Sequence, residues 1–167
     1  MTTIIRTAAT RDIDLITDLI RKAFATVAAD LDLTPENAPT HPSNCTPEWV
    51  RTAMNKGIPY YILEYDDQPV GCVALERANQ DVCYLERLAV LPECRHKGLG
   101  RALVRHAMKR TLAVGASRLE IAAIGEQDDL LFWYEQFGFM INRRKQFDHL
   151  PFEVVFMGMN LAGDEQH

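Results

Sequence analysis

The sequence has no excess of positive charge and no long hydrophobic segment. Its 167 residues include 18 Lys and Arg against 23 Asp and Glu, a formal net charge of -5, so it lacks the basic stripe of a nucleic-acid-binding protein. Its longest apolar runs, such as Ile121 to Ile124, are far shorter than the ~20 residues that a membrane span needs, and its start has no cationic leader. These absences predict a cytoplasmic protein that binds neither nucleic acid nor membranes.

Residues that commonly bind metal ions are few and poorly spaced. The cysteines form no CxxC pair of the kind that binds zinc, and the histidines form no HxxxH pair on an expected helix. The cysteines are Cys45, Cys72, Cys83 and Cys94, and the histidines are His41, His96, His106, His149 and His167. We therefore expect buried or incidental thiols and no metal site.

Length and composition favour one well-packed domain. The chain has 47% hydrophobic and 25% charged residues, so it is able to bury a sizeable core, about two-thirds of the unfolded surface for a domain of this size. We expect a single domain over residues 1–167, with no internal repeat and no linker.

The first third of the chain predicts one strand, two helices and a long loop. A strand at 3–8 precedes a helix that Thr10 caps and that continues to about Val27, with apolar residues at helical spacing. Four prolines at 33–47 exclude regular structure there and predict a functional loop. A short helix then runs to Lys56.

Strand-forming stretches dominate the rest of the chain. Those at 60–65, 70–76 and 82–90 predict an antiparallel meander. A helix at 99–113 should connect the third of these to a parallel strand at 118–123. The last elements are a helix at 128–136 and a hairpin of strands at 139–147 and 152–161. The fold class is therefore α+β, with a mixed, mostly antiparallel sheet of about seven strands and about four helices.

A turn with two glycines carries the clearest chemical signal. It follows the strand that ends at Val90 and opens a helix, whose first backbone amides have no partner within the helix and so favour an anion such as phosphate. Gly98 and Gly100 allow close approach of the backbone, and nearby basic residues add positive charge. A dinucleotide fingerprint would need a third glycine where Leu103 stands, and the Gly-Lys-Ser/Thr of a P-loop is absent. The alternative is a plain strand-to-helix turn.

Two motifs resemble the GNAT family of acetyl-CoA-dependent N-acetyltransferases. Arg95-x-x-Gly98-x-Gly100 is similar to the family's Arg/Gln-x-x-Gly-x-Gly/Ala motif. About forty residues further on, the stretch from Trp133 to Phe139 resembles its Tyr-Glu-x-x-Gly-Phe signature. The resemblance extends from the first strand to the last hairpin and implies the GNAT fold and acetyl-CoA as co-substrate.

The resemblance also implies roles for individual residues. The strand end would pair with the pantetheine arm, the glycine turn would bind the pyrophosphate, and Tyr134 would lie beside the thioester sulfur. Gln127 occupies a position where the family often has an Asn that contacts coenzyme A. The implied cofactor-binding residues are Leu88, Ala89, Val90, Arg95, His96, Lys97, Gly98, Leu99, Gly100, Arg101, Gln127 and Tyr134.

Acetylation of an amine near neutral pH requires a group that removes a proton, because an alkyl ammonium has a pKa around 10. Glu86 is the first candidate, since strand alternation places Tyr84, Glu86 and Leu88 on one face. Its alternative role is an ion pair with an arginine. Glu120 is the second candidate, or else a solvent-facing strand residue. Tyr134 could protonate the departing thiolate, or only pack among neighbouring aromatic rings.

Four further residues are candidates for binding the acceptor. His41, Asn44 and Trp49 belong to the proline-rich loop and the short helix, which in the resembled fold usually line the acceptor side, although Trp49 could equally belong to the core. His149 lies in the connection of the final hairpin, where it could contact substrate, relay protons or only stabilise a turn.

Three functions remain open on the sequence alone. The first is direct transfer of an acetyl group from acetyl-CoA to a primary amine of a small molecule or peptide. The second is a non-catalytic module that binds or senses acyl-CoA, and the third is an acyltransferase with another acyl chain or acceptor. An exposed final hairpin would also be compatible with a homodimer.

Overall fold

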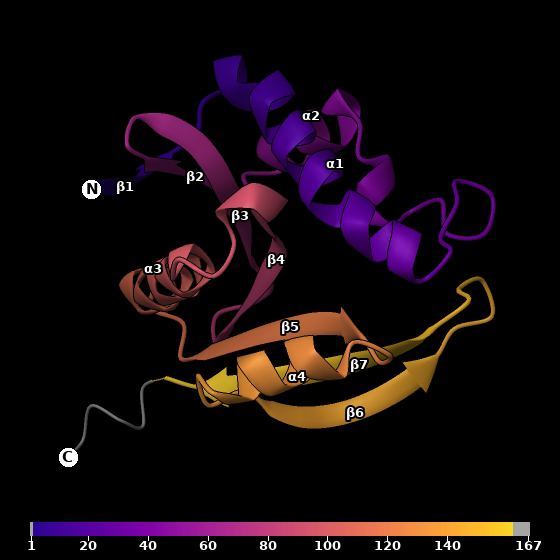
Figure 1. Cartoon of the computed structure of the whole chain (residues 1–167). Coiled ribbons are helices and arrows are strands. Elements are labelled where there is room, and N and C mark those ends of the chain that lie inside the picture. Colours follow the sequence, from indigo (N-terminus) through magenta and orange to yellow (C-terminus); the bar gives the residue numbers. More distant parts are fainter. Residues whose placement is uncertain (1, 162–167) are drawn as a thin grey trace.

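The protein is a seven-stranded mixed sheet with four α-helices, in a computed structural model that describes residues 2–161 (Figure 1). The strands are β1 (Thr3–Thr7), β2 (Tyr60–Tyr65), β3 (Gln68–Arg77), β4 (Val82–Val90), β5 (Arg118–Ile124), β6 (Met140–Gln146) and β7 (Glu153–Asn160). The helices are α1 (Ile13–Asp30), α2 (Pro47–Asn55), α3 (Leu99–Ala113) and α4 (Asp128–Glu135). The predicted α+β class is confirmed.

The order of strands in the sheet is β1-β2-β3-β4-β5-β7-β6. The first four strands form an antiparallel meander, and α3 connects β4 to the parallel strand β5. The final hairpin places β7 beside β5 and leaves β6 at the edge with every residue exposed. Both expected supersecondary units, the meander and the crossover, are therefore present.

Helices cover both faces of the sheet (Figure 1). Ile16 and Ile20 of α1 and Val50 of α2 pack against Ile62 and Cys72 on one face, which we call the α1/α2 face. Leu103 of α3 and Leu131 of α4 belong to the core on the opposite, α3/α4 face. Each strand residue can thus be assigned to a face by the cluster that it joins.

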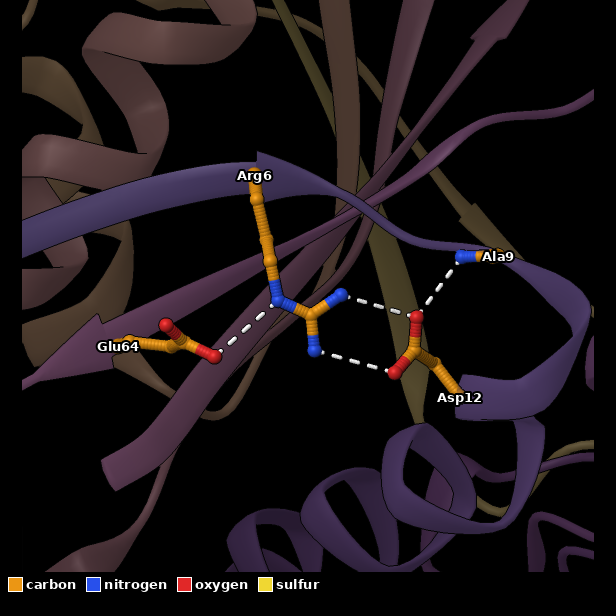
Figure 2. A network of polar contacts seen from close by, with 4 residues as sticks. All are labelled: Arg6, Ala9, Asp12 and Glu64. Carbon is orange, nitrogen blue, oxygen red and sulfur yellow. Dashed lines mark hydrogen bonds and ion pairs between the residues drawn. The ribbon is translucent and has the colours of Figure 1, made fainter. Parts of the chain in front are cut away.

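A polar network fixes the chain where β1 meets α1 (Figure 2). The guanidinium of Arg6 donates to both carboxylate oxygens of Asp12, at 2.9 and 3.0 Å, and to Glu64 of β2 at 3.1 Å. Asp12 also accepts the backbone N–H of Ala9 at 2.8 Å. The expected cap at Thr10 is wrong, because a 3-10 turn at Thr10–Asp12 precedes α1 and Asp12 takes the capping position.

The long loop between α1 and α2 has only one short 3-10 turn, at Pro42–Asn44, as its prolines predict. None of the four helices is long and apolar enough to cross a membrane. Residues 2–161 contain no cluster of side chains suited to a metal ion. His167 lies outside the described residues.

Candidate active site

The sheet opens between β4 and β5 (Figure 1). These parallel strands pair only at their first residues, Val82 with Arg118, Cys83 with Leu119 and Tyr84 with Glu120. Beyond Tyr84, β4 keeps its pairing with β3 as far as Val90. Within residues 2–161, no strand pairs with the edge of β4 from Leu85 to Val90 that faces β5. An extended ligand could pair with such an edge by backbone hydrogen bonds.

A β-bulge interrupts β4 at this opening. Arg87 has a φ of 52°, and the register with β3 shifts between the pairs Ala74–Glu86 and Cys72–Ala89. The extra residue reverses the alternation of side chains that follow it. Leu88 therefore packs on the α3/α4 face, and the expectation that it shares a face with Tyr84 and Glu86 is wrong.

A cavity of about 710 Å³, here called the main cavity, occupies the opening. It reaches both faces of the sheet, because Leu88 and Tyr134 line it from the α3/α4 side while Glu86 and His41 line it from the α1/α2 side. Of the expected site residues, it brings together Glu86, Leu88, Glu120, Gln127, Tyr134 and His41.

The glycine turn has the geometry of an anion site. Gly98 has a φ of 78°, in the left-handed region that favours glycine, and it caps α3. The first intrahelical hydrogen bond runs from the N–H of Ala102 to the carbonyl of Gly98 at 3.1 Å. The amides of Leu99, Gly100 and Arg101 are thus left without helical partners at the positive end of a 15-residue helix.

Gly100 has a different task from Gly98. A Cβ at Gly100 would lie 3.3 Å from Cζ2 of Trp133, whereas one at Gly98 would meet nothing within 4 Å. Trp133 in turn contacts the ring of Tyr134 edge to face, with centroids 5.1 Å apart. The absence of a side chain at Gly100 therefore lets α4 pack against the start of α3.

The basic residues of the turn are anchored within the protein. The guanidinium of Arg95 donates to the carbonyl of Ala23 at 2.8 Å and to Oγ1 of Thr26 at 3.2 Å, both on α1. Lys97 lies over the ring of Tyr65 and Arg101 over the ring of Phe137. Arg95 thus connects the turn to α1, while the other two side chains lie over aromatic rings.

Tyr134 and Gln127 line the main cavity from the α4 side. Burial raises the pKa of the Tyr134 phenol well above its ordinary value of 10, so the phenol carries its proton at neutral pH and is able to donate it. Gln127 precedes α4 at its capping position. Their predicted contacts with coenzyme A stay predictions.

Glu86 has the properties of a proton acceptor. It is half-buried, and no hydrogen bond or ion pair to its side chain occurs within residues 2–161. Burial raises the pKa of its carboxyl, the nearby Glu76 raises that pKa further, and Arg87 lowers it. A carboxylate with a raised pKa that lines a cavity is better matched to a proton from an ammonium than an ordinary surface carboxylate.

Glu120, the second candidate, is already paired. Its Oε2 accepts from Nε of Arg118 at 2.7 Å. Arg118 also donates to Asn160 and Asn142, so it connects β5 to β6 and β7. Glu120 lines the main cavity as predicted, but its charge is neutralised by a neighbour on its own strand.

The expected acceptor residues separate into two groups. His41 is buried in the wall of the main cavity, and burial lowers its pKa. Trp49 lines a smaller neighbouring cavity. Asn44 donates to the carbonyl of Ala38 and lines neither cavity, and His149 lies near the ring of Phe147 and also lines neither.

Sequence reasoning missed several residues of the main cavity. These are Phe24 from α1, Asn142 and Arg143 from β6, and Phe152 and Phe156 around β7. Phe24 follows the helical spacing of apolar residues that predicts core packing, so this spacing does not mark it as a residue of a cavity. No local signal marks the others, because the folding of the hairpin alone brings them to the site.

The chain belongs to the acetyltransferase (GNAT) family, whose model matches residues 18–139. It is 26% identical over 123 residues to the N-acetyltransferase YjgM of Escherichia coli strain K12, which covers 72% of this chain and 74% of that protein. The members of this family transfer acyl groups, and the open sheet with its glycine turn fits an acyltransferase.

Solved structures share the fold. The ribosomal-protein-S18-alanine N-acetyltransferase from Escherichia coli superposes with a TM-score of 0.77 at 16% identity, over 96% of this chain and 94% of that one. The yncA protein of Salmonella typhimurium, solved with its cofactor acetyl-CoA, gives a TM-score of 0.70 at 18% identity, over 96% and 95%.

Proposed function

We propose that the chain transfers an acetyl group from acetyl-CoA directly to a primary amine of a small molecule or peptide. The observation that carries this proposal is the unpaired, half-buried Glu86 in the wall of the main cavity, with Tyr134 in the opposite wall. A base and a proton donor on either side of an open sheet are the two groups that amide formation from a thioester needs.

The free backbone edge of β4 and the amides at the start of α3 would hold the cofactor. Leu88, Ala89 and Val90 would pair with its pantetheine arm, and the amides of Leu99 to Arg101 would bind its pyrophosphate. The open space beside Gly98 supports this fit. Bound acetyl-CoA supplies the thioester carbonyl that the amine attacks.

Glu86 and Tyr134 would manage the protons. Glu86 accepts a proton from the acceptor's ammonium, so that the neutral amine can attack. As the C–N bond forms and the C–S bond breaks, Tyr134 donates its phenolic proton to the sulfur. The extra proton on the nitrogen passes back to the Tyr134 phenolate through water, and Glu86 releases its proton to solvent, so both side chains regain their starting states. The products are the amide, free coenzyme A and one proton.

A direct transfer is favoured over an acetyl-enzyme intermediate. The described residues that line the main cavity include no cysteine and no serine. Cys45 and Cys83 are buried with raised pKa values, and burial raises the pKa of Cys72 to about 12. These thiols are therefore protonated and poor nucleophiles near neutral pH.

The decisive experiment compares wild type with Tyr134→Phe in a screen of primary amines that detects released thiol. We expect the variant to lose at least tenfold in kcat while it binds coenzyme A with unchanged affinity. Phe132→Leu, a change at an exposed residue of the same helix, is the matched control. A wild type that binds acetyl-CoA but acetylates none of the amines would favour the sensing module instead.

A further inference from the structure

A second cavity of about 350 Å³ lies beside the main one, and we call it the side cavity. It is bounded by Trp49 and Ala53 of α2, by Tyr60 of β2, and by Ala74 and Glu76 of β3. Ala74 pairs with Glu86 across the strands, so the side cavity lies on the α1/α2 face, the same face as Glu86.

Only two of the described residues line both cavities, Glu86 and Arg87. They belong to the bulge of β4, which directs the Arg87 side chain between the two spaces. A residue that lines two adjoining cavities forms the wall between them. The main cavity therefore ends, on this side, at the side chain of Arg87 and at the carboxylate that we assign as the base.

The side chain of Arg87 is firmly held in this position. Its Nη1 donates to the hydroxyl of Tyr60 at 2.8 Å, and its Cζ lies 5.4 Å from the centroid of the Trp49 ring. Both partners line the side cavity. The hydrogen bond and the cation–π contact hold the guanidinium from two directions.

We propose that Arg87 determines acceptor length by closing the side cavity to the substrate. An amine that meets Glu86 from the main cavity can extend only within that cavity while the Arg87 side chain separates the two spaces. Removal of its side chain would join the two spaces and give a longer acceptor a second path. This inference rests on the proposed function, because it takes Glu86 as the place where the amine reacts.

The test uses a series of linear primary amines from propylamine to octylamine with Arg87→Gly. Glycine is chosen because it adopts the left-handed φ of this position without strain. We expect the ratio of kcat/KM for octylamine to that for propylamine to rise at least tenfold over wild type, since each methylene in a matching pocket is worth about 10–200-fold. The ratio cancels any general effect of the lost charge on Glu86.

Two further variants test whether Arg87 separates the two cavities or only stabilises the local structure. Tyr60→Phe removes the hydrogen bond to Arg87 but keeps the ring, so it should shift the ratio in the same direction by a smaller factor. Lys56→Ala changes a residue that lines the side cavity alone, and the ratio should stay that of wild type. If Arg87→Gly does not fold, Arg87→Asn serves instead, because Asn tolerates the left-handed region.

An unchanged ratio in Arg87→Gly, or an equal change in Lys56→Ala, would overturn the proposal. If wild type binds acetyl-CoA but acetylates none of the amines, the proposed function fails separately. The role of Arg87 as the wall between the cavities is then tested by calorimetric titration of octylamine into the complex of the protein with coenzyme A. Binding at least tenfold tighter to Arg87→Gly than to wild type supports it, and equal binding refutes it.

Discussion

The guanidinium of Arg118 lies 2.7 Å from the carboxylate of Glu120, two residues further along β5. Because side chains alternate along a strand, residues two apart share a face. This pair removes the free negative charge from one of two carboxylates that line the main cavity, and it leaves Glu86 as the unpaired one. The two carboxylates should therefore respond differently to the same substitution.

Glu86→Gln should lower kcat by about 10²–10⁴, the usual contribution of a general base, and Glu120→Gln should lower it less than tenfold. Because burial and Glu76 raise the pKa of Glu86, wild-type kcat/KM should rise with pH through that raised pKa, and Glu86→Gln should lose this acid limb. Steady-state kinetics from pH 5 to 9 measures both effects. The reverse pattern would identify Glu120 as the base.

Gly98→Ala should weaken acetyl-CoA binding and destabilise the protein by about 1–2 kcal/mol, the cost of a left-handed φ for a residue with a Cβ. Gly115→Ala is the matched control, because Gly115 also has a positive φ, 88°, but lies at the other end of α3. Both variants should lose similar stability in denaturant titrations. Only Gly98→Ala should lose affinity for acetyl-CoA. Equal affinities of the two variants would show that the turn at Gly98 does not bind the cofactor.

Acidification from pH 7 to 5 should lower the melting temperature. Burial lowers the pKa values of His41 and His106 below 6.5, so the unfolded chain binds more protons and stability falls as pH drops below 6.5. The raised pKa of Glu86 favours the folded state on acidification, which opposes the effect of the histidines. A comparison with the variant His106→Phe therefore isolates the contribution of one histidine.

Nε2 of His106 is buried and has no hydrogen-bond partner among residues 2–161, and its ring contacts that of Tyr61 edge to face. His106→Phe keeps an aromatic ring at this position and removes the group that titrates. It should raise the melting temperature at pH 5 more than at pH 7, whereas His149→Ala, at an exposed histidine, should follow wild type. A parallel shift of His106→Phe at both pH values would contradict the assignment.

Asp12→Asn should destabilise the protein by about 1–3 kcal/mol. Loss of a buried ion-pair partner typically costs 3–5 kcal/mol, and the partial exposure of Arg6, 31%, screens part of it. Asp18→Asn, in the exposed pair with Lys22 on the same helix, should leave stability unchanged. Urea titration at pH 7 distinguishes the two. Equal losses would show that the network in Figure 2 contributes nothing specific.

Much of the fold followed from local sequence. The strands of the meander, the helix from Leu99 to Ala113 and the turn at Gly98 are set by alternation, helical spacing and a glycine at a left-handed position, and each prediction is confirmed. Most helix and strand ends lie within two residues of expectation, whereas α1 ends three residues later, at Asp30. The ends vary because the last hydrogen bonds of an element depend on its neighbours.

The details of the site depend on contacts between distant segments. The bulge at Arg87 has no signature in the sequence, and it moved Leu88 to the other face. The bond from Arg95 to Ala23 joins residues 72 positions apart, so local pattern could not supply it. The ion pair of Arg118 with Glu120 could have been predicted from the sequence, because residues two apart on one strand share a face.

The opening between β4 and β5 interrupts the sheet in its middle, where other folds keep their best-protected hydrogen bonds. Amides of β4 that pair with β3 should exchange slowly with water, and those that face the opening should exchange fast until an extended ligand pairs with them. Hydrogen exchange of the β4 amides would thus report whether a ligand occupies the opening. The ligand should slow exchange at alternate residues of this one strand.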